Sequence, residues 1–273
     1  MLKTPDWGLM IVLYFFFGGI AGGAYFTAAI ADNFGGVRDR RVAKIGYLLS
    51  LPLVAICGLL LIADLGVPTR FLNMLRTLKF WDPMSLGAWG VGVFGAFTFV
   101  SSVLSFSDEP SRVALRRKIG LVGMLFGFFL ASYTGVLLSV TAQPFWSEAR
   151  LLGALFLASG ASTGMAAISL ILFLLGSSST DLGKIKRADR YSMIIELVML
   201  AAFLVLLGSA AQPLLSGHYA ALFWIGLVGV GLVIPLIVDF VGHRTHALAA
   251  LSALLVLAGG FVLRYVMLMS IQS

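Results

Sequence analysis

Four ionisable side chains fall within or at the ends of long apolar stretches of the sequence. They are Asp64, Glu196, Asp239 and Arg264. A charge is costly in a hydrocarbon environment, so such residues often mark proton paths, ligand sites or internal pairs. A carboxyl group there can take up and release protons, and an arginine can bind an oxygen-rich group.

Each of these residues also has a structural interpretation. Asp239 and Arg264 lie near the ends of their stretches, from where a side chain can extend to the membrane interface. Asp64 can be an ordinary interfacial acid. Glu196 lies about a turn and a half into its apolar segment. If its role is structural, we expect its carboxylate to be buried against an arginine or a serine.

Several polar residues are expected at one depth near one face of the membrane. Asp64 and Arg264 should lie there together with Tyr133 and Thr134, and Arg70 lies in the loop that follows Asp64. A quinone needs hydrogen-bond donors for its carbonyl groups and a titratable group for its protons. This set supplies both, although the residues alone predict only a polar site near that face.

Glu196 and Asp239 lie toward the opposite face. They suggest a second hypothesis, a proton path from that face toward the site, which would make turnover electrogenic. Asp64 would then exchange protons at the site itself.

The elements that position these residues follow from the composition. Of the 273 residues, 60% are apolar and only 11% are Asp, Glu, Lys or Arg, whereas a soluble domain carries about 25% charged residues. This composition excludes a soluble enzyme, a nucleic-acid-binding protein and a disordered chain. The net charge of +7 is better explained by basic loops on one side of a membrane.

The cysteine and histidine counts bear on redox cofactors. Cys57 is the single cysteine, and the three histidines, His218, His243 and His246, avoid the middle of the apolar stretches. One thiolate cannot hold an iron–sulfur cluster, and a membrane haem needs axial ligands inside the bundle. We therefore expect no haem, no iron–sulfur cluster and no other metal site in this chain.

Eight apolar segments are long enough to cross a bilayer, which takes about 20 helical residues. They are continuously apolar instead of alternating, which favours helices over strands. The sequence thus predicts an all-α integral membrane protein with eight transmembrane helices. We expect the spans near residues 9–31, 45–64, 87–107, 119–141, 151–176, 191–211, 220–241 and 247–269.

The distribution of Lys and Arg predicts the orientation. Four of these residues fall in each of the loops 32–44, 108–118 and 177–190, and one falls in 242–246, whereas the loops of the other side carry five in all. Basic loops stay in the cytoplasm. Both termini are therefore expected on the periplasmic side of a bacterial inner membrane.

Glycine pairs in the first span predict close helix packing. Gly18 and Gly22 are four residues apart and share a helix face, and so do Gly19 and Gly23. A neighbouring helix backbone can therefore approach closely. Because such packing leaves little space, we expect a ligand to lie beside this helix. A similar run of small residues occurs at 159–164. We expect two four-helix bundles, residues 1–145 with the polar site and residues 146–273.

The loop at 65–86 is the longest connection between spans. It is either a short interfacial helix with Trp81 as an anchor or a docking surface for a partner. The candidate docking residues are Arg76, Lys79, Trp81 and Asp82.

The motifs resemble those of the NrfD/PsrC family, the membrane subunits of polysulfide reductase type. The fairly specific part is the loop with Asp64-Leu65-Gly66-Val67-Pro68-Thr69-Arg70-Phe71, Asn73-Met74-Leu75 and Pro83-Met84-Ser85-Leu86-Gly87-Ala88-Trp89. Less specific matches are the glycines of the first span, Tyr133-Thr134-Gly135-Val136-Leu137-Leu138-Ser139, and Gly259-Gly260 followed by Leu263-Arg264-Tyr265-Val266.

The resemblance implies a quinone-reactive subunit without haem. Such subunits sit under a ferredoxin-like iron–sulfur subunit, which connects to a molybdopterin catalytic subunit or a multihaem cytochrome. Menaquinone or ubiquinone would bind near the periplasmic face of the first bundle, lined or supported by Asp64, Arg70 and Tyr133. Some relatives place a His or Asn in the first span near the quinone. The first span of this sequence has neither, which leaves Tyr14 or Trp7 as a donor.

We therefore expect two-electron exchange between quinol and an external iron–sulfur partner. The direction of electron flow is open. A secondary transporter or ion channel is an alternative, for which helices broken near Pro52 or Pro235 would be a sign. A passive membrane anchor of the complex is another.

Overall fold

The protein is described by a computed structural model that covers residues 7–36, 39–65, 76, 83–141, 144–176, 183–241, 246–270 and 272. These residues form helices and contain no strand. Eight helical segments within them are long and apolar enough to cross a membrane. The prediction of an all-α protein with eight candidate spans is confirmed.

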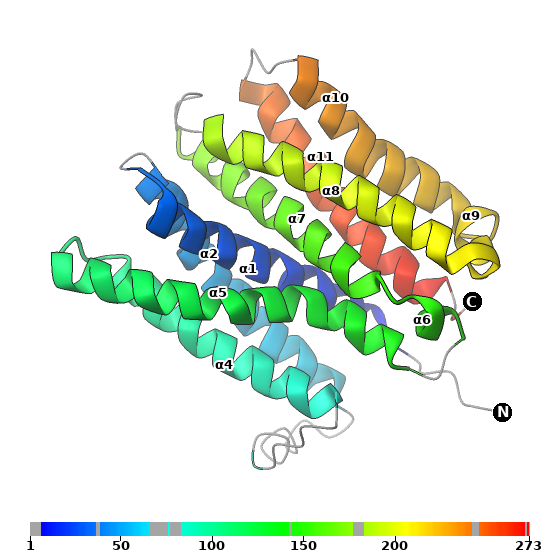
Figure 1. Ribbon diagram of the computed structural model, residues 1–273, viewed down its shortest axis with the longest axis horizontal. Helices are drawn as coiled ribbons and strands as arrows, with labels where there is room; N and C mark the ends of the chain where they lie inside the picture. The colour runs from blue at the N-terminus through cyan, green and yellow to red at the C-terminus, as the bar shows by residue number, and fades with distance from the viewer. Residues whose placement is uncertain are drawn as a thin grey trace.

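The helices follow one another with short connections where these are described (Figure 1). They are α1 (Leu9–Phe34), α2 (Arg40–Asp64), α4 (Pro83–Leu104), α5 (Pro110–Ser139), α6 (Pro144–Glu148), α7 (Leu152–Leu174), α8 (Gly183–Leu207), the 3₁₀ turn η3 (Gly208–Ala211), α9 (Gln212–Leu215), the π-helical stretch η4 (Leu222–Val233), α10 (Ile234–Val241) and α11 (His246–Met269).

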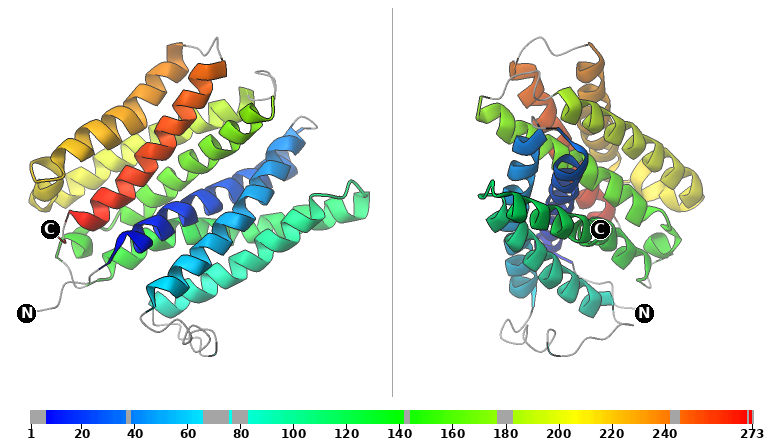
Figure 2. Two further views of the ribbon diagram at one scale, coloured as in Figure 1. Left: turned by 180° about the vertical axis from the view of Figure 1, so that it is seen from behind. Right: turned by 60° about the vertical axis from the view of Figure 1, so that its left-hand side comes forward.

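Two of the long helices occupy the middle of the molecule. In α1 and α7, 67% of the apolar stretch is buried inside the protein, against 28% in α2 and α8. α1 packs on α2, α5 and α7, and α7 packs on α8 and α11. In Figures 1 and 2, α2, α4 and α5 therefore lie on one side of this central pair, and α8, η4, α10 and α11 lie on the other.

Glycines allow the central helices to touch along their backbones. A Cβ atom on Gly23 of α1 would overlap the carbonyl oxygen of Gly160 on α7, and a Cβ on Gly164 would overlap Gly23 in turn. Gly22 meets α5 in the same way, at the carbonyl oxygen of Gly127. The predicted close approach of a neighbouring backbone is confirmed at Gly22 and Gly23. It is not found at Gly18, where a Cβ atom would meet only side-chain atoms of Cys57 and Leu130 at 3.8 Å or more.

Several helices extend further than their apolar segments. α5 begins at Pro110 and α8 at Gly183, whereas the apolar pattern predicts starts near residues 119 and 191. A helix satisfies its own backbone hydrogen bonds outside the bilayer as well as inside it, so the hydrophobic boundary does not end it. Charged residues that hydrophobicity assigns to loops consequently lie on helices.

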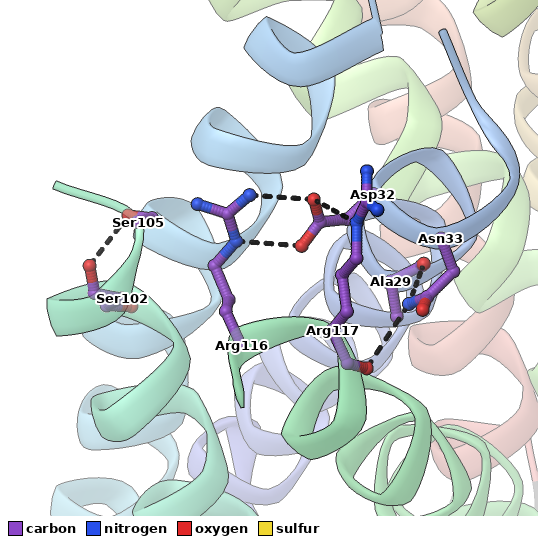
Figure 3. A network of polar contacts seen from close by, with 7 residues as sticks. All are labelled: Ala29, Asp32, Asn33, Ser102, Ser105, Arg116 and Arg117. Atoms are coloured by element: carbon purple, nitrogen blue, oxygen red, sulfur yellow. Dashed lines mark hydrogen bonds and ion pairs between the residues drawn. The ribbon is translucent and has the colours of Figure 1, made fainter. Parts of the chain in front are cut away.

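One such residue is buried near the end of α1. Arg116 on α5 donates two hydrogen bonds of 2.7 Å to the carboxylate of Asp32 on α1, and both side chains are buried (Figure 3). The half-exposed Arg117 lies 3.7 Å from the same carboxylate. This fork-to-fork geometry is the strongest form of arginine–carboxylate contact and fastens α5 to α1.

The two prolines within the predicted spans differ in their local helix geometry. α2 runs without interruption through Pro52. Pro235, which has no N–H to donate, is the second residue of α10, where the π-helical stretch η4 passes into α-helix.

The first and last described residues meet at one end of the protein. The backbone N–H of Trp7 donates to the side-chain oxygen of Gln272 at 3.1 Å. The Trp7 ring stacks on Trp146 of α6, whose indole N–H donates to the carbonyl oxygen of Met267 at 3.0 Å. The start of α1 and the end of α11 are therefore held side by side.

Candidate functional site

A cavity of about 280 Å³ opens between α1, α2, α4 and α5. It lies at the end of the molecule where α1 begins, α2 ends and α4 begins. Its walls are mostly apolar. Its volume is close to the lower end of the range for small-molecule sites, about 300 Å³.

Glycines make part of this space. A Cβ atom on Gly58 of α2 or on Gly92 of α4 would meet nothing within 4 Å, and both residues line the cavity. Gly87 also lines it and is covered by the ring of Tyr133, which leaves no room for a Cβ. The wall is therefore flat on two sides and suits a planar, apolar ligand.

Three polar side chains face this space. Asp64, the last residue of α2, is exposed at its edge, and Tyr133 of α5 donates from its hydroxyl group to the carbonyl oxygen of Pro83. Tyr14 of α1 lies deeper and is only 3% exposed. The cavity thus has a carboxylate at its mouth and a phenol inside.

The hydroxyl group of Tyr14 has no hydrogen-bond partner among the described residues. Its backbone carbonyl accepts a weak bond of 3.7 Å from the Cys57 thiol, but the phenol itself is unused. A buried donor without a partner costs about 1–3 kcal/mol, and most such groups in proteins are paired. Because Tyr14 lines a cavity, a ligand oxygen is a natural partner for it.

The structure brings together some of the predicted site residues. Asp64 and Tyr133 both line the cavity, as do the alternative donors Tyr14 and Trp7. Thr134 is buried next to Tyr133 but does not line it. Arg70 lies outside the described residues.

The structure does not place Arg264 in the cavity. Arg264 is 1% exposed, and its guanidinium donates to the hydroxyl of Ser159 at 2.6 Å and to the carbonyl oxygen of Gly260 at 2.8 Å. The guanidinium lies over the ring of Phe156, which in turn contacts Phe15 of the cavity wall. These contacts hold Arg264 between helices, whereas its place in the sequence predicts a position at the level of the cavity and beside Asp64.

Glu196 of α8 belongs to the same buried network as Arg264. It is 2% exposed and accepts a 2.5 Å hydrogen bond from Ser162 of α7, one turn from Ser159. Through the two serines, the carboxylate and the guanidinium balance each other's charge between α7, α8 and α11. Of the structural alternatives for Glu196, a buried partner of an arginine or a serine, the contact with serine is the one observed.

Asp239 of α10 lies at the opposite end of the protein from the cavity. Its carboxylate accepts a 2.6 Å bond from Arg190 of α8, which also donates to the Asp239 backbone oxygen at 3.0 Å. Asp239 also lines a small pocket of about 20 Å³, together with Ser169, Lys186, Asp189 and Ser252.

Asp189 is a partly buried acid that the charge pattern does not single out. It falls in the segment 177–190, which stands out in the sequence only for its basic residues. Its Oδ1 atom is buried and has no hydrogen-bond partner among the described residues. The available signal was its position seven residues before Glu196, because two helical turns place both carboxylates on one face of α8.

The remaining predictions concern docking and metals. Arg76 is helical and exposed, while Lys79, Trp81 and Asp82 lie outside the described residues. Within the described ranges, no three His, Cys, Asp or Glu side chains gather in a way that could hold a metal ion.

Comparison with known proteins gives matches over the whole chain. Residues 2–273 match the family described as "Polysulphide reductase, NrfD". The C component of polysulfide reductase from Wolinella succinogenes is 28% identical, and the match covers 99% of this sequence and 96% of the relative. A protein NrfD homolog of Haemophilus influenzae is 27% identical over 97% of this sequence and 94% of its own. The C component of selenate reductase from Mesobacillus selenatarsenatis is 21% identical over 98% and 74%.

Proposed function

Because this chain belongs to the NrfD family of polysulphide reductase membrane proteins, we propose that it is the quinone-reactive membrane subunit of a reductase complex. It is a multi-pass integral membrane protein. The relatives that are components of polysulfide reductase and selenate reductase support a role beside a separate catalytic subunit. In this proposal the protein exchanges two electrons between menaquinone or ubiquinone and that complex.

The observation that carries the proposal is the cavity between α1, α2, α4 and α5. Its flat apolar walls suit a quinone ring, and its unpaired phenol, Tyr14, is a donor for a quinone carbonyl. Asp64 at the mouth is a titratable group that can pass protons to or from the ring oxygen nearest the water. Tyr133, beside Gly87, closes one side of the ring site.

The two ends of the quinone ring would meet different environments. The inner carbonyl would accept a hydrogen bond from Tyr14, which substitutes for the His or Asn of some relatives. The outer carbonyl would lie toward Asp64 and toward Arg70, whose predicted role at the site we retain as a proposal. Thr134 and Arg264, placed behind the wall, would support the ring site without touching the quinone.

The partner would dock over the mouth of the cavity. We propose a ferredoxin-like iron–sulfur subunit on the periplasmic face, with a molybdopterin subunit or multihaem cytochrome beyond it. The docking surface would be the segment 65–86 with Arg76, Lys79, Trp81 and Asp82. An external cluster is needed at this place because electrons have to leave or reach a quinone at the mouth.

The remaining architecture follows the expectations from the sequence. We propose two four-helix units, residues 1–145 with the quinone cavity and residues 146–273, in a bacterial inner membrane. Both termini would be periplasmic, since the most basic connections belong to the end away from the cavity. Asp64 would handle protons at the mouth, with Glu196 and Asp239 on the opposite half as further proton-transfer residues.

Quinone binding to the purified protein tests this function. A short-tailed menaquinone analogue should quench the fluorescence of Trp7, which lines the cavity. Asp64→Asn and Tyr14→Phe should each weaken binding by about tenfold, the equivalent of one hydrogen bond of about 1.4 kcal/mol. Asp108→Asn, an exposed carboxylate at the opposite end, is the matched control.

The outcomes separate the alternatives. Saturable binding that Asp108→Asn preserves and the two cavity variants weaken supports the proposal. Absence of binding while an iron–sulfur subunit still copurifies would indicate a passive anchor. Absence of binding together with solute or ion flux in vesicles would indicate a transporter or channel.

A further inference from the structure

The cavity has an opening in its side wall in addition to its mouth at the end of the molecule. Gly92 of α4 lines the cavity and is nevertheless exposed, and Gly58 of α2, which also lines it, is only half-buried. A Cβ atom on either glycine would meet nothing within 4 Å. Within the described part of the chain, no side chain therefore fills the line of contact between α2 and α4 at this level, which we call the α2–α4 seam.

This opening lies below the ends of the helices. Gly58 is six residues before Asp64, the last residue of α2, and Gly92 is nine residues after Pro83, the first residue of α4. At 1.5 Å per residue, the two glycines lie about 9 Å and about 14 Å from the helix ends that border the mouth. The opening therefore faces the hydrocarbon of the bilayer, whereas the mouth faces its surface.

The α2–α4 seam stays open and apolar beyond the cavity. One turn further along α4, a Cβ atom on Gly95 would meet only Val54 of α2, at 4.0 Å. Residues 51–63 of α2 and 83–104 of α4 include no Asp, Glu, Lys or Arg. The large side chains on the flanks, Leu59 and Phe99, are exposed. This surface suits a hydrocarbon chain better than a polar ligand.

The seam between α4 and α5 is closed by aromatic rings. A Cβ atom on Gly87 of α4 would overlap the ring of Tyr133, and one on Gly90 would overlap the ring of Phe129. These two rings of α5 also stack on each other. The glycines on this face of α4 are therefore covered, whereas Gly92 and Gly95 on its other face are not.

The remaining walls of the cavity are closed as well. Between α1 and α2, the thiol of Cys57 contacts the backbone oxygen of Tyr14 at 3.7 Å, and both side chains are buried. On its far side, α5 is covered by α7, because a Cβ atom on Gly135 would overlap the carbonyl oxygen of Leu152. Among the described residues, the α2–α4 seam is thus the side wall through which the cavity meets lipid.

The place of this opening agrees with the shape of a quinone that carries an isoprenoid chain. The two carbonyl groups of such a quinone lie at opposite ends of the ring, and the chain leaves the ring from its side. If the carbonyls point toward Tyr14 and toward Asp64, the chain has to leave through a side wall. The buried hydroxyl of Tyr14, unpaired among the described residues, independently indicates that a ligand occupies the space behind the opening.

We propose that the isoprenoid chain of the bound quinone leaves the cavity through the α2–α4 seam at Gly58 and Gly92 and lies against Gly95 on its way into the bilayer. The inference rests on the proposed function, because it needs a quinone ring in the cavity. It defines the substrate as a quinone that stays anchored in lipid by its chain and enters sideways from the membrane. Glycine is required in the seam because a larger residue would occupy the path of the chain.

Two ligands with the same ring separate binding of the ring from passage of the chain. Menadione has the naphthoquinone ring of menaquinone but no isoprenoid chain. The dissociation constants of both are measured for the protein in lipid nanodiscs, through quenching of Trp7, which lines the cavity. Gly95→Phe places a ring in the seam without changing a residue that lines the cavity. It should weaken binding of menaquinone by about tenfold, as overpacking by one side chain does, and leave binding of menadione as in wild type.

Ala201→Phe is the matched control. Ala201 is exposed on α8, six residues before Leu207, the last residue of that helix, and no residue of α8 lines the cavity. The substitution adds the same ring to a lipid-facing surface and should leave binding of both ligands unchanged. The melting temperatures of the two variants show that both are folded.

A label on the chain tests the same route in the unmodified protein. A menaquinone analogue with a photoreactive group on the isoprene unit next to the ring should label residues 54–59 of α2 and 91–99 of α4. Labels on α5 or α7 instead would show that the chain leaves through another wall and would refute the route.

Failure of the inference is distinguishable from failure of the proposed function. If menadione binds to wild type and Gly95→Phe does not change the affinity for menaquinone, the seam holds only lipid acyl chains and the inference is refuted, while the quinone function stands. Equal weakening of both ligands by Gly95→Phe would also refute it, because the substitution would then act on the ring site. If neither ligand binds to wild type, the proposed function itself is refuted.

Discussion

Tyr14 and Tyr25, three turns apart on α1, have opposite hydrogen-bonding states. The hydroxyl of Tyr25 is paired with Ser101 at 2.7 Å, whereas the hydroxyl of Tyr14, which is also buried, has no partner among the described residues. Tyr14 lines the cavity and Tyr25 does not. One helix thus carries a structural phenol and a phenol that is available to a ligand.

This contrast predicts opposite effects of the same substitution. Tyr14→Phe should weaken binding of a menaquinone analogue by about tenfold, through loss of one hydrogen bond, and should maintain or raise thermal stability in detergent, because it removes an unpaired buried donor. Tyr25→Phe should lower the free energy of unfolding by about 1 kcal/mol and leave binding unchanged. If Tyr14→Phe binds the analogue as wild type does, the phenol is not its donor.

The crossing of α1 and α7 predicts intolerance at Gly23. Gly23→Ala places a methyl group on the carbonyl oxygen of Gly160, which is backbone and cannot rotate away. Overpacking of this kind costs about 1–3 kcal/mol or more, so the melting temperature in detergent should fall clearly. Gly95→Ala, whose Cβ would meet only Val54 at 4.0 Å, is the control and should melt like wild type.

The buried pair between α1 and α5 predicts a large loss when one partner is removed. Asp32→Asn or Arg116→Gln leaves the other charge buried, which costs about 3–5 kcal/mol. Arg117→Gln removes a half-exposed arginine 3.7 Å from the same carboxylate and should cost less than about 1 kcal/mol. Equal effects of Arg116→Gln and Arg117→Gln would contradict the geometry in Figure 3.

The contact between Asp39 and Lys184 predicts a dependence of stability on pH. Burial raises the pKa of Asp39, but the hydrogen bonds from Lys184 Nζ, at 2.6 Å, and from the Gly36 N–H, at 2.7 Å, outweigh it and bring the pKa below its usual value. This lowered pKa means that the folded state binds the proton less tightly than the unfolded state. The contribution of Asp39 is then complete above the unfolded pKa, about 3.9, and disappears as the pH falls through the folded value.

Thermal unfolding of wild type and Asp39→Asn at several pH values measures this contribution. The wild type should be more stable at pH 7, by about 1 kcal/mol or less because Lys184 is 76% exposed. The difference should shrink as the pH is lowered below about 4. A difference that grows on acidification would contradict the assignment.

The sequence predicted those features that hydrophobicity and local spacing determine. The eight spans follow from apolar length, and the contact of Gly23 with α7 follows from small residues four positions apart. Asp64 and Tyr133 line the same cavity because both lie at the same end of their helices. The position of a residue along the membrane normal can therefore be predicted from the sequence.

The neighbouring helix that a side chain faces cannot be predicted in the same way. Arg264 does not line the cavity, because its side chain turns to Ser159 and Gly260, where a buried guanidinium finds acceptors. Asp189 was hidden among basic residues, since charge counting ignores which face of α8 a side chain occupies. Such contacts depend on tertiary packing between helices far apart in the sequence.

The most direct test of the central claim is photochemical cross-linking of a photoreactive menaquinone analogue to the membrane-embedded protein, followed by peptide mapping. The account predicts labels on residues 7–15, 58–65 and 84–92, all suppressed by excess unreactive analogue and by Gly58→Leu, which fills the cavity where a Cβ now meets open space. Labels confined to α7, α8, α10 and α11, or labelling of the cavity that competitor does not suppress, would contradict it.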